Sequence, residues 1–516
     1  MCGEEEAVTE PNPTSCVDLP TPPAAKVGET WRIWLLLFIG AALLYALTAS
    51  RGVQWQDPGA NILRVATGEW INPLGLALSH PLHHILALLA AAPGLLETAL
   101  AVTLVSAFTG ALAVANTYGA AMALTQRRLP AVYAALSLAV AQTFWQMATI
   151  AETYTLTAAL FAAECWCLAL FLRGGRSRYL LAALFLNGLG ISNHLLAVLS
   201  TPVLVAVVVY CLRARRIAWR ELALAAALWL IGTLPYSALV ATHLVRSGDV
   251  VGTLHSALFG HAYAGAVLNA SIQPRVLMIS FGFLGLSFPS LLLPLAIHGI
   301  VRSFRGALPR PLAFALLVEL LLHAGFVLRY NIVDQNTFFL PMFTLLCMFG
   351  GMGLSGVLAW SPGAKRKVVL VASLVTLVWT PAVGALAPTI IRRSGVLDSI
   401  VRNKPYRDDY TYLFIPWSIA DDSADRLSRK AVELAGDDGL IVMEDSMASF
   451  AVRYRVIESG KTQIVVASAK DEAALTAAIA AGKPIVLVPL DTDQPATPLP
   501  AGQWQRADQL YIWQSE

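Results

Sequence analysis

The sequence predicts a mainly α-helical bundle that crosses a membrane many times, followed by a small α/β domain. Of its 516 residues, 57% are hydrophobic and 13% are charged, a composition far more apolar than a soluble protein surface tolerates. Stretches of roughly 20 apolar residues, enough for a helix to cross a hydrocarbon core about 30 Å thick, recur between residues 31 and 388. After residue 389 the apolar stretches become short and β-branched, which indicates strands.

Eleven apolar stretches are predicted to be transmembrane helices. A further short apolar helix, Pro81 to Ala92, is too short to span the membrane and is expected to be interfacial or re-entrant. The predicted spans are 31–49, 96–124, 130–145, 150–172, 178–191, 194–212, 221–241, 276–301, 311–328, 337–360 and 368–388.

Basic residues indicate how the spans are oriented. Fifteen Arg and Lys residues fall in five short loops, and Glu221 is nearly their only acidic neighbour. By the positive-inside rule these loops are cytoplasmic, so the N-terminus is predicted inside and the part after residue 389 outside. The clusters are Arg127 and Arg128; Arg173, Arg176 and Arg178; Arg213, Arg215, Arg216 and Arg220; Arg302, Arg305 and Arg310; and Lys365, Arg366 and Lys367.

The chain is predicted to have three parts. Residues 1–30 are acidic and proline-rich, which favours a disordered cytoplasmic tail, and they lack the basic start of a signal peptide. Residues 31–388 form the transmembrane domain. In residues 389–516, "GLIVMED", "TQIVVAS" and "KPIVLVPL" alternate with helical stretches, which predicts an extracytoplasmic α/β domain. The six cysteines lie in the tail or in and beside apolar spans, so neither a disulfide framework nor a zinc site is indicated.

Eleven polar residues suited to chemistry lie on the predicted outer face, so any chemistry is expected outside the cytoplasm. From Arg178 to Asn193 is 15 residues, or about 22 Å of helix, so Asn193 and His194 should lie recessed below the outer surface. Glu152 is expected in the first turn of its helix, where the helix dipole favours a carboxylate even without a function. The polar residues on this face are Asp57, His80, Glu152, Asn193, His194, His243, Asp249, His255, His261, Arg329 and Asp334.

Several common site types find no support in the sequence. No HExxH motif, paired CxxC motif or histidine cluster with ligand spacing occurs, and glycine-rich phosphate loops are absent. Single histidines at helix ends are more often structural than functional. We therefore assign a structural role to His83, His84, His243, His255, His261, His298 and His323.

The stretch "TFWQMATIAETYTL", followed about 35 residues later by "GLGISNHLLAVLS", resembles the paired signature of a known family. That family comprises multi-spanning membrane proteins of bacteria and eukaryotes. It is related to the endoplasmic-reticulum O-mannosyltransferases that act on plexin-type receptor domains, within the C-type, lipid-phosphosugar-dependent glycosyltransferases. "RYNIVDQNTFFLPMF" resembles a later element of the family, with Asn331, Asp334 and Pro341 in register. The resemblance covers residues 31–390 and implies a C-type glycosyltransferase architecture.

The first external loop departs from the family pattern. The family usually has D-S-G-E and then H-P-P-G-Y-P-L-Y, where this chain has "DPGA" (57–60) and "HPLHHILA" (80–87). Ala60 therefore replaces a glutamate, and Leu82, His83 and His84 stand at the P-G-Y positions. The sequence leaves open whether activity survives this change.

The resemblance implies that Asp57 is the general base that takes the proton of the acceptor hydroxyl. Arg329 and Arg64 are candidate phosphate partners by charge alone. No metal-binding residue is predicted, and the need for a divalent cation is left open. The predicted substrate-binding residues are His80, Glu152, Tyr154, Asn193, His194, Arg329, Asp334 and Arg64.

The predicted function is transfer of a sugar, with mannose as one candidate, from a polyprenyl-phosphate donor to an extracytoplasmic protein or glycan acceptor. The alternative is a non-enzymatic transporter or flippase for a lipid-linked or amphiphilic solute. If the protein is a transferase, Asp57, Glu152, His194 and Asp334 should face one outward cavity. We expect membrane lipid but no nucleic acid as a partner, and a bacterial inner membrane as the location, with the site facing the periplasm or exterior.

Overall fold

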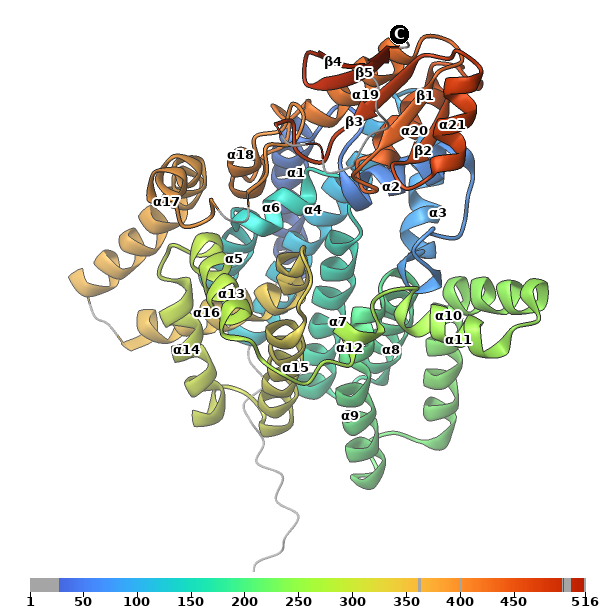
Figure 1. Cartoon of the computed structure of the whole chain (residues 1–516). Coiled ribbons are helices and arrows are strands. Elements are labelled where there is room, and N and C mark those ends of the chain that lie inside the picture. Colours follow the sequence, from blue (N-terminus) through green and yellow to red (C-terminus); the bar gives the residue numbers. More distant parts are fainter. Residues whose placement is uncertain (1–26, 361–362, 399–400, 494, 496–502, 515–516) are drawn as a thin grey trace, which may run out of the picture.

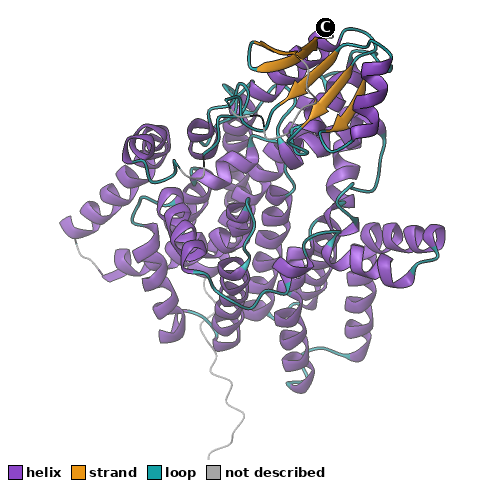
Figure 2. Cartoon of the chain, in the orientation of Figure 1, coloured by secondary structure: helices purple, strands orange, loops and turns teal. Residues whose placement is uncertain are grey.

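A computed structural model of the chain describes residues 27–360, 363–398, 401–493, 495 and 503–514. It consists of a helical bundle with a small sheet-containing domain at one end (Figures 1 and 2). The predicted disordered tail, residues 1–30, lies outside the described residues except for its last four. These four form the beginning of the first helix, α1 (Val27–Thr48), so the tail prediction is wrong for them.

The bundle contains thirteen of the described helices, and all eleven predicted spans fall on them. Their number and order confirm a mainly helical protein with several apolar membrane helices. After α1 they are α4 (Thr98–Thr125), α5 (Arg128–Ala139), α6 (Gln142–Ala148), α7 (Tyr154–Gly174), α8 (Ser177–Asn193), α9 (Thr201–Arg213), α10 (Trp219–Ser247), α13 (Pro274–Ser287), α14 (Leu292–Arg302), α15 (Arg310–Arg329), α16 (Leu340–Trp360) and α17 (Ala364–Ser394).

The predicted count of eleven membrane-crossing helices is too high by the criterion of helix length and composition. Among the described residues, 8 helices are long and apolar enough to cross a membrane, or 9 if a pair bent by 99° counts as one span. That pair joins α13 to α14, which continues into the π-helical turn η3 (Ser303–Ala307). The predicted span 130–145 is broken at Ala141 into α5 and α6, and α8 has only 17 residues. Hydropathy detects a continuous apolar run but not a break in the backbone within it.

Three of the basic clusters gather at one end of the bundle. Arg173 Nη1 donates to the carbonyl oxygen of Leu124 at 3.2 Å, and Arg127, Arg173 and Arg302 line one shallow cavity there. The C-terminal domain lies at the opposite end, where the Ser418 N–H donates to the carbonyl oxygen of Thr48 at 3.0 Å. The basic loops and the C-terminal domain therefore lie at opposite ends of the bundle. The sequence predicted this, because it placed the basic loops inside and the part after residue 389 outside.

The C-terminal domain is the predicted α/β domain, with one extension. Strands β1, β2 and β3 pair in parallel, whereas β5 pairs antiparallel with both β3 and β4, so the order is β2-β1-β3-β5-β4. The hairpin β4–β5 was not predicted, because its polar first strand lacks the β-branched pattern. The elements are α18 (Asp409–Phe414), α19 (Ser423–Ala435), β1 (Leu440–Met443), α20 (Ser449–Glu458), β2 (Val465–Ser468), α21 (Glu472–Ala480), β3 (Ile485–Val488), β4 (Gln503–Ala507) and β5 (Leu510–Gln514).

The short helix α6 fastens the C-terminal domain to the bundle. Gln142 Nε2 donates to the carbonyl oxygen of Leu413 at 3.2 Å, and Gln146 Nε2 donates to that of Tyr412 at 2.6 Å. Trp145 packs against Trp417, with ring centroids 5.7 Å apart. Trp145 and Gln146 belong to the family-like stretch 143–156 that contains Glu152. Part of that stretch therefore holds the C-terminal domain against the bundle.

The first external loop lies between the bundle and the C-terminal domain. Buried Trp55 precedes α2, and its Nε1 donates to Ser423 Oγ at 2.7 Å. The Gln56 N–H donates to the carbonyl oxygen of Met447 at 3.3 Å. The C-terminal domain thus holds the start of α2, the helix that contains Asp57. The loop comprises α2 (Gln56–Thr67), the 3₁₀ turn η1 (Leu76–Leu78) and the predicted short helix α3 (Pro81–Ala91).

Two further 3₁₀ turns interrupt the bundle, η2 (Leu195–Leu199) and η4 (Gln335–Phe339). Non-helical backbone in a membrane is tolerated only where its polar groups find partners within the protein. Buried Asn187 supplies such a partner, because its Nδ2 donates to the carbonyl oxygen of Ala197 at 3.0 Å and to Glu164 Oε2 at 3.2 Å. Its Oδ1 accepts from Thr201 Oγ1 and Trp229 Nε1, each at 3.0 Å.

We predict that Asn187→Leu destabilises the bundle although leucine has a similar size. Each buried group left without a partner costs about 1–3 kcal/mol, and the substitution removes the partner of several groups at once. The measurement is the thermal unfolding temperature in detergent. Thr201→Val, which removes one donor to Asn187, is the matched control and should lower the temperature less. Equal losses in the two variants would contradict this role.

Candidate active site

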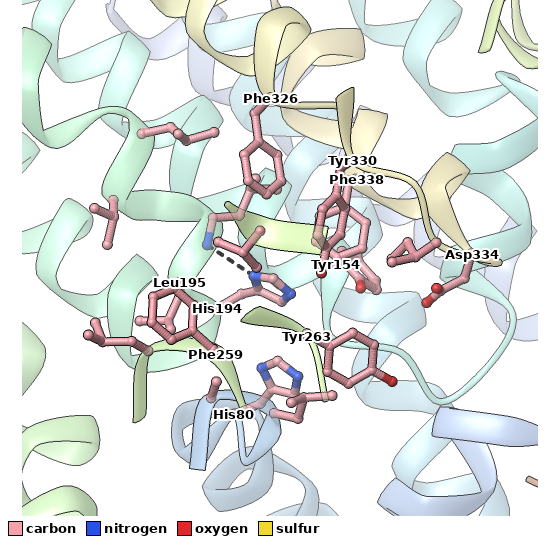
Figure 3. Close-up of a pocket in the computed structure, with 18 of the residues that line it drawn as sticks. His80, Tyr154, His194, Leu195, Phe259, Tyr263, Phe326, Tyr330, Asp334 and Phe338 are labelled. Atoms are coloured by element: carbon pink, nitrogen blue, oxygen red, sulfur yellow. Dashed lines mark hydrogen bonds between the residues drawn. The ribbon is translucent and has the colours of Figure 1, made fainter. Parts of the chain in front are cut away.

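A cavity of about 360 Å³ lies at the end of the bundle nearer the C-terminal domain. Its wall combines two carboxylates, one guanidinium, two imidazoles and a set of aromatic rings contributed by α2, α7, α15 and the intervening loops. Figure 3 shows the two imidazoles, of His80 and His194, with Asp334 and the aromatic rings. Residues around η2 add an apolar side. The polar and aromatic residues of the wall include Asp57, His80, Tyr154, His194, Tyr263, Arg329, Tyr330, Asp334 and Phe338.

Asp57 and Asp334 are close enough to influence each other's ionisation. Burial and, to a lesser degree, the charge of Asp334 together raise the pKa of Asp57 from its usual 3.8 to about 7. Burial also raises the pKa of Asp334. Asp57 Oδ1 is buried and has no hydrogen-bond partner among the described residues, so this atom is available to a ligand. A carboxylate with a pKa near 7 is suited to accept a proton at neutral pH.

Glu152 is buried just behind this cavity and does not line it. The prediction that Glu152 lies in the first turn of a helix is wrong, because α7 begins at Tyr154 and Glu152 precedes it. Its Oε2 accepts from the N–H of Thr153 at 3.2 Å. Burial, followed by the charges of Asp57 and Asp334, raises its pKa well above the usual value. Glu152 is thus an electrostatic neighbour of both wall carboxylates.

His80 and His194 stack at the base of the cavity, with ring centroids 4.9 Å apart and planes 17° apart. Burial lowers the pKa of His80 to about 4 and that of His194 well below its usual value, so both rings are neutral at pH 7. His80 Nδ1 faces the carbonyl oxygen of Asn193 at 2.7 Å and must donate, which leaves Nε2 as an acceptor. His194 Nδ1 accepts from the N–H of Leu196 at 3.0 Å, so its Nε2 holds the proton and is a donor.

Asn193 supports the site from behind. Its Nδ2 donates to the carbonyl oxygen of Thr153 at 3.0 Å and to Thr157 Oγ1 at 2.8 Å. The backbone carbonyl oxygen of Asn193 faces His80. Asn193 therefore connects the loop that contains Glu152 to the stacked histidines. Tyr154 does line the cavity, and its ring lies 5.0 Å from that of His194.

The two predicted phosphate partners lie in different places. Arg329 lines the cavity, donates through Nη1 to the carbonyl oxygen of Val267 at 2.6 Å, and lies over the Phe326 ring. Arg64 is buried outside the cavity wall, where its Nη2 donates to the carbonyl oxygens of Trp70 at 2.5 Å and Ser79 at 2.9 Å. Arg64 therefore braces the loop before His80, and a phosphate contact by this residue has no basis in the arrangement.

Sequence reasoning missed the aromatic wall of Tyr263, Tyr330 and Phe338. The Tyr330 and Phe338 rings lie 4.8 Å apart, and Phe338 lies 5.1 Å from Tyr154. For Tyr263 and Tyr330 the available signal was their position in predicted external segments, whereas Phe338 falls within the predicted span 337–360. Within the described part of the chain, no three histidine, cysteine or acidic side chains are grouped so as to hold a metal ion.

The fold is that of a multi-pass membrane protein with a small C-terminal sheet domain, as the sequence predicted. The structure is similar to the crystal structure of ArnT from Cupriavidus metallidurans bound to undecaprenyl phosphate. The TM-score is 0.59 with 16% identity, over 93% of this chain and 97% of that one. The apo structure of the same protein gives a TM-score of 0.57 with 15% identity, over 94% and 98% of the two chains. An oligosaccharyltransferase of Archaeoglobus fulgidus gives 0.47 with 13% identity, over 88% and 67%.

The sequence match is more specific than the fold. Residues 69–217 match the family model described as the N-terminal domain of protein O-mannosyl-transferase TMEM260, which confirms the resemblance drawn from the motifs. The matched segment contains His80, Glu152 and His194, whereas Asp57 and Asp334 lie outside it. No curated protein matches the chain in sequence.

We predict that Asp57→Asn stabilises the folded protein at pH 8 by on the order of 1–3 kcal/mol. The folded pKa of about 7 exceeds the ordinary 3.8, so the folded state binds this proton more tightly than the unfolded chain does. The stability due to Asp57 is therefore present at low pH and is lost as the pH rises through about 7. Thermal unfolding between pH 5 and pH 8 measures the effect, and the gain should shrink toward pH 5. Asp437→Asn, at a side chain 93% exposed, is the control; a pH-independent gain at Asp57 would contradict the prediction.

Proposed function

We propose that the protein is an integral membrane glycosyltransferase that moves a sugar from a polyprenyl-phosphate donor to a hydroxyl of a protein or glycan outside the cytoplasm. The observation that supports this most directly is the joint presence of Asp57, His194 and Arg329 in one cavity with an apolar side. Mannose is the first sugar to test, because the matching family model is described as an O-mannosyl-transferase.

The proposed reaction uses the wall residues as follows. Ionised Asp57 takes the proton of the acceptor hydroxyl, whose oxygen forms a bond to the anomeric carbon of the sugar. The bond from that carbon to the phosphate oxygen breaks, and polyprenyl phosphate leaves with the bonding pair. Positively charged Arg329 and the Nε2–H of His194 are the groups of the wall that can stabilise the departing phosphate.

The donor's lipid also has a suitable surface. Leu195, Leu196, Val198 and Leu199 of η2 and Ile332 form the apolar side of the cavity, where an isoprenoid chain loses contact with water. The similar ArnT structure is of a protein bound to undecaprenyl phosphate, and we extend that lipid class to this chain. We place the cavity on the periplasmic or exterior side, in a bacterial inner membrane.

The arrangement favours transfer over transport of an amphiphilic solute. Of the four residues expected to face one cavity in a transferase, Asp57, His194 and Asp334 line it, whereas Glu152 does not and lies behind the wall. A transporter could also use the apolar side and a titratable carboxylate. What favours transfer is that the same wall holds Arg329 and His194, which can stabilise a leaving phosphate, beside Asp57. The steps above do not require a divalent cation. Measuring the transfer rate with and without a chelator tests whether one takes part.

We predict that Asp57→Asn lowers transfer from polyprenyl-phosphate mannose by about 10²–10⁴-fold, because a general base contributes rate enhancement of this size. The assay follows release of polyprenyl phosphate by the purified protein in lipid. Asp437→Asn should be unaffected, and Asp57→Asn should still bind the donor. Activity equal to wild type in Asp57→Asn would remove this residue from the role of base.

We predict that the transfer rate rises with pH and levels off above about pH 7, because Asp57 must be ionised to act as a base. At pH 5 the rate should be about 1% of the plateau. Asp334→Asn removes a charge that raises the Asp57 pKa, so the rising limb should move to lower pH. The same limb in wild type and Asp334→Asn would show that the two carboxyl groups are not coupled.

A further inference from the structure

The segment after Pro235 forms a helical arm beside the bundle. The arm comprises residues 236–247 of α10 and the antiparallel helix α11 (Val250–Phe259), which lie side by side and project sideways beyond α3 and α8 (Figure 1). Tyr236 Oη donates to the carbonyl oxygen of Ala257 at 2.5 Å. His243 and Thr253 are hydrogen-bonded at 3.1 Å nearer the tip. Its polar side chains thus pair with one another between the two helices.

The large exposed apolar residues of the arm lie mainly on α11, with Val245 beside them on α10; exposed His255 also lies on α11. Single exposed apolar residues are normal on proteins, but a contiguous set marks an interaction surface. Within residues 236–259 the charged side chains are Arg246 and Asp249, both at the tip. The exposed residues are Val245 (85%), Val250 (54%), Val251 (79%), Leu254 (51%) and Leu258 (58%).

This surface continues the lipid-facing side of α10. Leu230, Ile231 and Leu234, on the part of α10 before Pro235, are also exposed. From Arg220, at the basic end, to Pro235 is 15 residues, or about 22 Å of helix, less than the roughly 30 Å of the hydrocarbon core. Pro235 cannot donate a backbone hydrogen bond and favours a bend at that point. The arm therefore leaves the bundle below the outer edge of the hydrocarbon core.

We propose that the arm lies in the outer leaflet of the membrane and that its partner is the lipid itself. The inner end of the arm is fixed to the protein, because the N–H of Leu76 donates to Ser256 Oγ at 3.0 Å and the N–H of His261 donates to the carbonyl oxygen of Leu74 at 2.8 Å. Leu258 and Phe259 at this end line the cavity. The arm thus connects the acyl-chain region to the rim of the cavity, and this placement holds whatever reaction the cavity performs.

The test places a nitroxide label at Val251→Cys in protein reconstituted into phosphatidylcholine–phosphatidylglycerol vesicles. The background has Cys2 and Cys16 replaced by serine, and the unsubstituted background corrects for labelling of the remaining cysteines. Matched labels are Leu230→Cys, on the membrane face of α10, and Lys470→Cys, exposed in the C-terminal domain. Power saturation compares collisions of each label with oxygen, which concentrates in the hydrocarbon, and with a water-soluble nickel complex.

We expect the oxygen-to-nickel collision ratio at Val251→Cys to be several-fold higher than at Lys470→Cys and similar to that at Leu230→Cys. A ratio like that of Lys470→Cys would overturn the proposal. Dipolar broadening between labels on separate chains, persisting as protein is diluted in lipid, would instead assign the surface to a second copy and also overturn it. Leu254→Cys repeats the measurement one turn away, so the result does not depend on one substitution being tolerated.

Discussion

The structure depends on one constraint: several helices end inside or just above the membrane, where each freed backbone group must find a partner within the protein. The cavity exists because α8 stops at Asn193 and η2 follows it. Asn187 satisfies a carbonyl of that turn, and Asn193 binds the backbone of the loop before α7. Two amide side chains from one helix thus stabilise the interrupted backbone that brings His194 and Tyr154 together.

The same constraint explains why the wall carboxylates are unusual. Asp57 lies on a helix held by the C-terminal domain through Trp55 and the Gln56 N–H, and Asp334 follows the end of α15. Neither is paired with a cation across a salt bridge among the described residues. Burial without such a partner is what raises the pKa of both groups. The C-terminal domain therefore holds the helix that carries one of these two buried carboxyl groups.

Prediction from sequence succeeded where local pattern decides structure. Periodic apolar runs identified the helices, and β-branched runs identified β1, β2 and β3. The motif around Glu152 identified the family-like region. Prediction from sequence failed where a break in the backbone or the direction of a side chain determines the structure. The predicted span 130–145 is two helices, α5 and α6, and Glu152 lies before the first turn of α7. The Arg64 side chain points away from the cavity. Gln146 belongs to the family-like motif, although it also holds the C-terminal domain.

The sequence by itself determined the membrane class, the alternation of basic and polar loops, the α/β nature of the last part and the set of polar residues from which the site is built. Charge and hydropathy depend only on residues that are neighbours in the sequence, so they can be predicted without the tertiary structure. Only the tertiary structure decided which of those polar residues share a wall, because one cavity brings together positions up to 277 residues apart, from Asp57 to Asp334. The aromatic wall and the tautomers of the two histidines likewise follow from packing and hydrogen bonds that no single segment specifies.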